Sequence, residues 1–126
     1  MIGEFVKTAD WKMEKHVPVI DCAQRMRSNE PFSVVVTVGR DIPHPNEPGH
    51  HIDWIALHYV PEGSSTSVEL ARCAFSAHGA GSGLASGVVK TSATMTVQVA
   101  VEKPGKLIAT AYCNIHGLWS SECPLA

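Results

Sequence analysis

Residues 94–113, TMTVQVAVEKPGKLIATAYC, decide the fold class of this chain. Apolar side chains alternate with other residues over positions 95–101 and again over 107–113. A period of two is typical of strands that bury one face, and the Lys-Pro-Gly-Lys segment at 103–106 is a turn signal. The stretch therefore predicts two neighbouring strands joined by a short turn.

The same pattern continues on both sides of this stretch. Alternating apolar positions occur over 34–38 and 55–59, and segments 17–22 and 68–76 can also be interpreted as strands. Turn signals occur at Ser28-Asn29-Glu30-Pro31 and at Pro61-Glu62-Gly63. Six or seven short strands with regular turns predict an all-β antiparallel sandwich.

Two segments depart from this alternation. Residues Phe5 to Lys15 are compatible with a short helix, and residues 78–92, HGAGSGLASGVVKTS, are rich in glycine and serine. Such a composition is typical of a long flexible loop. We expect one short N-terminal helix and one long loop around an otherwise all-β core.

Length, charge and hydropathy limit the possible functions. The 126 residues fit a single domain, 1–126, with a formal net charge of −2. This near balance argues against a nucleic-acid partner. Charged residues interrupt the hydrophobic runs of the N-terminal segment, and no stretch approaches the roughly 18 apolar residues of a membrane span. We therefore expect a cytoplasmic protein with no membrane association.

Cysteine and histidine supply the chemical clues. The four cysteines include no CxxC pair, which argues against a rubredoxin-type or zinc-ribbon site with four cysteine ligands. Cys22 and Cys73 fall on strand patterns and are expected in the core, whereas Cys123 is near the C-terminus and is expected to be exposed. The seven histidines are more than a chain of this size usually carries. His51, His58 and His78 are interpreted as structural.

Three segments at predicted strand ends could bind a metal ion together. Cys113 and His116 are three residues apart across a turn, His44 and His50 flank a loop with proline and glycine, and His16 precedes the first strand. Imidazole suits iron, copper and zinc, and thiolate adds a soft, electron-donating ligand. Four imidazoles around a plane, with a thiolate beneath it, would leave one axial position open for a small ligand.

Two other metal proteins fit parts of this pattern. A blue-copper electron carrier uses two histidines, one cysteine and usually a weak axial methionine. No methionine follows Cys113, and four grouped histidines exceed that set. A structural zinc module prefers four ligands in a closed tetrahedron. Both classes therefore fit less well than a single centre with four histidine ligands and one cysteine ligand.

Four motifs resemble those of the neelaredoxin-type superoxide reductases. They are DWKMEKHVPVI (10–20), IPHPNEPGHHIDWI (42–55), FSAHG (75–79) and YCNIHGLW (112–119), and they occur in the family's order. The resemblance covers residues 9–122. The rubredoxin-like domain that begins the two-iron relatives, the desulfoferrodoxins, is missing, so the chain resembles a form with one centre. The loop PNEPGHH departs from the family, in which threonine and glutamate tend to precede the histidine pair.

The resemblance implies an immunoglobulin-like β-sandwich of about seven strands that holds one iron ion per chain. By motif position, the iron ligands would be His16, His44, His50 and His116, with Cys113 as the axial thiolate. Glu14 would bind the sixth position in the ferric form only, and Lys15 would lie near the open ferrous position and attract superoxide.

The implied activity is the one-electron reduction of superoxide to hydrogen peroxide, with iron cycling between Fe²⁺ and Fe³⁺. The resemblance also implies an external electron donor, rubredoxin or a similar small carrier, and a homotetramer or homodimer.

Overall fold

The computed structural model describes residues 1–81 and 89–126. In the described residues, strands and one short 3₁₀ helix, η1 (Ile2–Glu4), are the regular elements. The strands are β1 (Val6–Lys7), β2 (Val19–Cys22), β3 (Phe32–Thr37), β4 (Ile52–Pro61), β5 (Val68–Ala74), β6 (His78–Ala80), β7 (Val89–Lys90), β8 (Thr94–Val99), β9 (Gly105–Cys113) and β10 (Gly117–Leu125).

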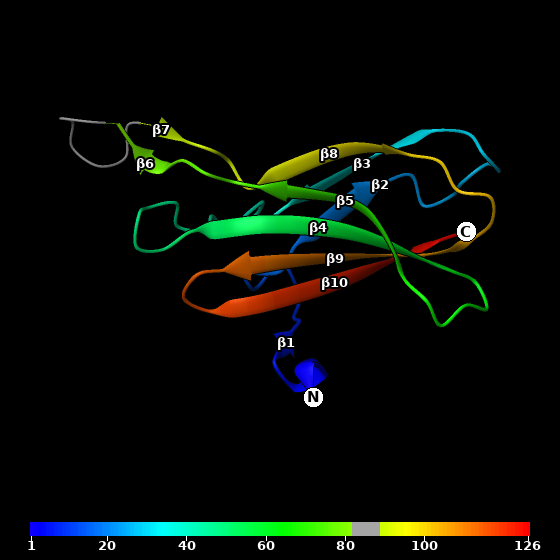
Figure 1. The fold of residues 1–126 in the computed structure, drawn as a ribbon, viewed down its shortest axis with the longest axis horizontal. Coiled ribbons are helices and arrows are strands. Elements are labelled where there is room, and N and C mark those ends of the chain that lie inside the picture. Colours follow the sequence, from blue (N-terminus) through cyan, green and yellow to red (C-terminus); the bar gives the residue numbers. More distant parts are fainter. Residues whose placement is uncertain (82–88) are drawn as a thin grey trace.

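These strands form two facing sheets and a small hairpin (Figure 1). The larger sheet has the order β1-β10-β9-β4-β5, the smaller sheet has the order β2-β3-β8, and β6 pairs with β7. β1 runs parallel to β10, and the other recorded pairs are antiparallel. The prediction of an all-β, immunoglobulin-like antiparallel sandwich is confirmed. No helix among the described residues is long and apolar enough to cross a membrane.

The core lies between the two sheets. Its members come from alternate positions of the long strands, as the sequence pattern predicted: Val34 and Val36 from β3, Ile55 and Leu57 from β4, and Leu107 from β9 are each 0% exposed. Because successive side chains of a strand point to opposite faces, this alternation closes one face of each sheet over a shared interior.

Two local predictions were wrong, and one strand was missed. Phe5 to Lys15 form no helix: they contain β1 and then turns, in which Asp10 Oδ1 accepts the Lys12 backbone N–H at 3.0 Å. The segment 78–92 is not simply a loop, because β6 and β7 pair within it, while its residues 82–88 lie outside the described part. β10 was not predicted, since Gly117, Ser120, Ser121 and Pro124 weaken its strand pattern.

Strand pairing brings the predicted metal-binding segments to one end of the sandwich. Ile52 of β4 pairs with Cys113 of β9, and Cys113 pairs with Gly117 of β10. The start of β4, the end of β9 and the start of β10 therefore adjoin, as the left side of Figure 1 shows. The loop that carries His44 and His50 enters β4 at this end.

Candidate metal centre

The four predicted histidines form a closed ring at this end of the sandwich. Neighbouring imidazole centroids are 4.8 Å apart for His16–His44, 4.8 Å for His44–His50, 4.9 Å for His50–His116 and 4.7 Å for His16–His116. The diagonal His16–His50 distance is 6.2 Å. Four similar sides and one longer diagonal describe a near-square arrangement around a common centre.

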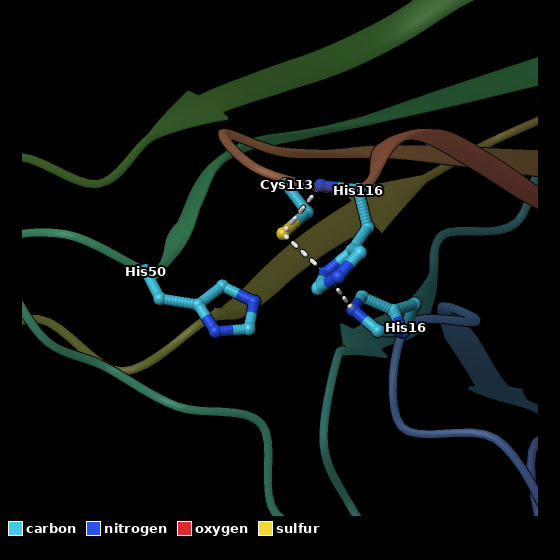
Figure 2. A group of neighbouring side chains, drawn as sticks. All are labelled: His16, His50, Cys113 and His116. Carbon is cyan, nitrogen blue, oxygen red and sulfur yellow. Dashed lines mark hydrogen bonds between the residues drawn. The ribbon is translucent and has the colours of Figure 1, made fainter.

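Cys113 lies beside this ring. Its side chain is fully buried, and its Sγ is 3.8 Å from Nδ1 of His116 (Figure 2). The donor atoms of His16, His50, Cys113 and His116 all lie within 4.8 Å of one another. The backbone N–H of His116 donates to the sulfur at 3.4 Å. A thiolate at this position would therefore be held and stabilised by the turn that also carries His116.

Hydrogen bonds select which nitrogen of each ring faces the centre. His44 Nδ1 donates to the Pro45 carbonyl at 2.7 Å, and His16 Nδ1 donates to Glu14 Oε1 at 2.6 Å. Both carbonyl and carboxylate oxygens only accept, so each Nδ1 carries the proton and each Nε2 keeps its lone pair. His116 instead presents Nδ1, which is 3.0 Å from His16 Nε2.

Two of these nitrogens are buried with no partner among the described residues. They are Nε2 of His44 and Nε2 of His50. Buried polar atoms are nearly always hydrogen-bonded. Two buried nitrogens without partners in one cluster therefore indicate that these atoms bind a metal ion. The donor set of four imidazole nitrogens and one thiolate fits a metal ion of intermediate softness such as iron. It exceeds the four ligands of structural zinc.

Electrostatics keeps these imidazoles in the neutral form that binds metals. Burial, followed by the neighbouring imidazoles and Lys15, lowers the pKa of His44 to about 4. Burial, then His116, His16 and Lys15, also lowers the pKa of His50. Neutral imidazoles can bind a cation at pH 7 without first losing a proton.

Glu14 and Lys15 adjoin the ring through the segment that carries His16. Glu14 accepts hydrogen bonds from His16 Nδ1 and from the His16 backbone N–H, the latter at 3.1 Å. The side-chain hydrogen bond from His16 is the main reason why the pKa of Glu14 is lowered. The charge of Lys15 acts on both His44 and His50.

Asn114 fastens the His50 loop to the Cys113 turn. Its Oδ1 accepts the His51 backbone N–H at 2.8 Å, and its Nδ2 donates to the Gly49 carbonyl at 3.0 Å. One side chain thus grips the backbone on both sides of His50. Sequence reasoning assigned no role to Asn114, although its place between Cys113 and His116 was the available signal.

Trp119 packs against the ring at His16 and His116. Its indole stacks on His16 with centroids 5.0 Å apart and planes 14° apart, and its Nε1 donates to the His116 carbonyl at 3.2 Å. Trp119 is 9% exposed. This buried indole therefore restricts the ring of His16 by stacking and the backbone of His116 by a hydrogen bond.

A second cluster, His51 with Asp53 and His78, lies next to this centre. The His51 and His78 rings stack with centroids 3.6 Å apart and planes 2° apart. Lone pairs in two parallel rings point along parallel lines and do not converge on one ion. All four ring nitrogens also have oxygen partners at 2.7–2.9 Å. This geometry favours the structural role predicted for both histidines.

His78 connects the β5–β6 segment to the histidine loop. Its Nδ1 is 2.8 Å from Asn46 Oδ1, between His44 and His50 in the chain, and its Nε2 is 2.7 Å from the Phe75 carbonyl. Asn46 Nδ2 in turn donates to the Thr91 carbonyl at 3.0 Å. These contacts hold the loop at Asn46, whereas Asn114 holds it at Gly49 and His51.

Comparisons with known proteins show which family this chain is similar to. The family model for desulfoferrodoxin matches residues 8–122. The neelaredoxin of Megalodesulfovibrio gigas is 44% identical over 124 residues, which cover 98% of this chain and 95% of the relative. The superoxide reductase of Pyrococcus furiosus is 44% identical over 126 residues and 99% of each chain. The solved superoxide reductase (neelaredoxin) of Archaeoglobus fulgidus in its reduced form has a TM-score of 0.84 at 44% identity, covering 97% of this chain and 98% of that chain.

Proposed function

The chain belongs to the desulfoferrodoxin family, and from this premise we propose that it is a superoxide reductase. The reaction consumes one superoxide, one electron and two protons and yields one hydrogen peroxide. The observation that carries the proposal is the convergence of His16, His50, His116 and Cys113, whose donor atoms lie within 4.8 Å of one another. The His44 ring adjoins those of His16 and His50, and Nε2 of His44 and of His50 are buried without partners among the described residues.

The iron ligands in this proposal are Nε2 of His16, His44 and His50, Nδ1 of His116 and Sγ of Cys113. The hydrogen bonds on the other ring nitrogens of His16 and His44 support this choice of atoms. All five donors come from one chain, which supports one iron ion per chain and a single domain over residues 1–126. When bound, the iron supplies a one-electron couple between Fe²⁺ and Fe³⁺.

Lys15 attracts the anionic substrate in this scheme. Its charge already acts on two rings of the site, so a superoxide that approaches these rings meets a positive potential. Lys15 can also donate a hydrogen bond to the substrate. Protons for the product come from water, since His116 and Glu14 are not fully enclosed.

Glu14 holds His16 in the geometry described here. A carboxylate that accepts from the outer nitrogen of a ligating histidine fixes the tautomer and raises the basicity of the other nitrogen. The family resemblance implies that Glu14 would bind the iron in the ferric form, whereas in the structure its Oε1 accepts hydrogen bonds from His16. We propose that Glu14 would hold His16 and would also bind the metal in the ferric form.

The remaining parts of the proposal concern partners and location. A small carrier such as rubredoxin would return the electron to the iron, as the family resemblance implies. We propose a homodimer or homotetramer in the cytoplasm, on the family resemblance.

Electron paramagnetic resonance of the purified, mildly oxidised protein tests the metal centre. A high-spin ferric signal with about one iron per chain, followed by rapid superoxide consumption without dioxygen release, is the expected result. A spin-one-half copper signal would reassign the site to electron transfer. A silent sample that contains only zinc would refute the enzyme.

A further inference from the structure

Two cysteines outside the metal centre lie at the opposite end of the sandwich. Cys22 is the last residue of β2, and Cys123 lies near the end of β10. Both side chains are half-buried and pack against the core. Figure 1 shows the end of β2 and the C-terminus on the same side, away from the β9–β10 loop that carries His116.

Strand register directs both thiols into the space between the sheets. Cys22 pairs with Val34 of β3, and Cys123 pairs with Leu107 of β9. Val34 and Leu107 are 0% exposed core residues. Directly opposite residues of an antiparallel pair point to the same face, so each cysteine points inward from its own sheet.

Hydrogen bonds hold the β2 segment and the β10 segment together on both sides of the cysteines. Ser121 Oγ donates to the Pro18 carbonyl at 2.6 Å. Farther along, the Ala126 backbone N–H donates to the Gln24 carbonyl at 2.8 Å, and the Met26 N–H donates to the Ala126 carbonyl at 2.8 Å. Facing sheets normally lie about 10 Å apart. These bonds bring the two segments closer together than facing sheets usually are. A disulfide needs an α-carbon separation of about 4.4–6.8 Å.

The environment of Cys22 supports a direct approach of the two sulfurs. Burial raises the pKa of Cys22 to about 11, and the neighbouring Cys123 raises it further. Cys22 therefore stays protonated at neutral pH. Thiolates are the reactive form, so Cys22 is disfavoured as the first thiol to react and is the one that resolves.

We propose that Cys22 and Cys123 are a peroxide-sensitive thiol pair that closes an intramolecular disulfide between the two sheets. The Cys123 thiolate attacks one oxygen of hydrogen peroxide and releases hydroxide, which leaves a sulfenic acid. The Cys22 sulfur then displaces water from this sulfenic acid and loses its proton. In total, two thiols and one hydrogen peroxide give one disulfide and two waters. The proposed function enters only as a source of the peroxide.

The cross-link would stabilise the fold. It joins residues about 100 positions apart, and closing so long a loop restricts the unfolded chain strongly. It also connects β2 with β10, and thus the smaller sheet with the larger one. The disulfide form is therefore expected to unfold at a higher denaturant concentration than the dithiol form.

Peptide mapping of the iron-loaded protein tests the pair. The protein is treated with hydrogen peroxide in one arm and with diamide, which oxidises thiols without metal chemistry, in the other. Unreacted thiols are then alkylated in denaturant. Cleavage after glutamate, which does not occur where proline follows, as at Glu30 and Glu47, separates the cysteines. Cys22 falls in peptide 15–62, Cys73 in 70–102, Cys113 in 103–122 and Cys123 in 123–126.

The expected product in both arms is peptide 15–62 linked to 123–126, lighter by two hydrogens than the sum of its parts. Cys73→Ser should leave this product unchanged, since Cys73 lies on β5. Cys22→Ser should abolish it, leave oxygenated Cys123, and remove the shift in the denaturation midpoint. A Cys22 that stays fully alkylable in the wild-type protein, or a link through Cys73 or Cys113, would overturn the proposal. Because no arm measures superoxide consumption, this result is independent of whether the proposed function holds.

Discussion

Replacing Asn114 by alanine should weaken metal binding without disturbing any ligand atom. The Asn114 side chain accepts the His51 N–H at 2.8 Å and donates to the Gly49 carbonyl at 3.0 Å, so it holds the peptide units on both sides of His50. The backbone bond from Asn114 N–H to the His51 carbonyl, 3.2 Å long, remains in the variant. The loop therefore stays attached to the Cys113 turn, but by one hydrogen bond in place of three.

The magnitude follows from the two lost bonds. A hydrogen bond within a protein contributes a net stability of about 0.5–1.5 kcal/mol, so the pair contributes about 1–3 kcal/mol. In the metal-free variant, His50 loses its fixed position, and a metal ion must then order the loop as it binds. If this whole cost falls on binding, the affinity decreases by about fivefold to 150-fold. Loss of a group that orients metal ligands typically costs about 10- to 100-fold, which lies in the same range.

Cobalt(II) provides the assay, since its thiolate complex absorbs visible light. Competition with a chelator gives the affinity of wild-type and variant proteins, and the absorption reports the Cys113–metal bond directly. A matched control is Gln98→Ala, which removes a side-chain amide that bonds to Ser33 on the smaller sheet, outside the centre. This control should bind cobalt(II) as the wild type does.

Two results would refute the reasoning about Asn114. One is an Asn114→Ala affinity equal to that of the wild type. The other is a loss of thermal stability of the metal-free variant with no change in affinity, which would make Asn114 a purely structural residue. A clear loss of affinity in Asn114→Ala alone would support a positioning role.

Three further predictions concern charge and burial. Lys15→Ala should slow superoxide reduction about tenfold at low salt and weaken its dependence on ionic strength. The control Lys103→Ala, at a distant turn, should change neither. Equal pulse-radiolysis rates for the wild type and both variants would contradict electrostatic steering by Lys15. Glu14→Ala should lower cobalt(II) affinity about 10- to 100-fold, because His16 Nδ1 loses its carboxylate partner. Glu14→Gln should recover part of this loss, because its amide oxygen can still accept from His16. Equal affinities of the wild type and both variants would contradict a role of this hydrogen bond in metal binding. Burial raises the pKa of Tyr59 above its ordinary value of 10.0, so the stability that this phenol contributes is present below pH 10 and is lost as the pH rises further. Tyr59→Phe should flatten the alkaline decrease in denaturation midpoint, although it also removes the 2.6 Å bond to the Lys103 carbonyl; an unchanged alkaline limb would contradict this assignment.

The sequence alone was enough to predict the long strands other than β10 and the chemical nature of the candidate site. Alternating apolar residues over 34–38, 55–59 and 95–101 correspond to buried faces of β3, β4 and β8. Such patterns are local, because a strand with one buried face must repeat every two residues. The candidate ligands could likewise be selected from short motifs, since Cys113 and His116 share one turn and His44 and His50 share one loop.

Weak local patterns explain what was missed. β10 contains Gly117, two serines and Pro124, and it becomes a strand because β9 pairs along its whole length. The predicted helix at residues 5–15 fails for a similar reason: β1 gains strand pairing with β10, and the turn at Asp10 is closed by a side-chain hydrogen bond. In both cases, contacts with distant residues outweigh intrinsic preference.

Only the tertiary structure decided how the selected residues act. His16 and His116 are 100 positions apart in the sequence, and pairing of β1, β10, β9 and β4 is what brings their nitrogens to 3.0 Å. The nitrogen that each ring presents depends on an oxygen placed by the fold, such as Glu14 Oε1. The approach of Cys22 and Cys123 likewise depends on the packing of two sheets. Periodicity records which face of a strand is buried, but it carries no information about which distant face is packed against it.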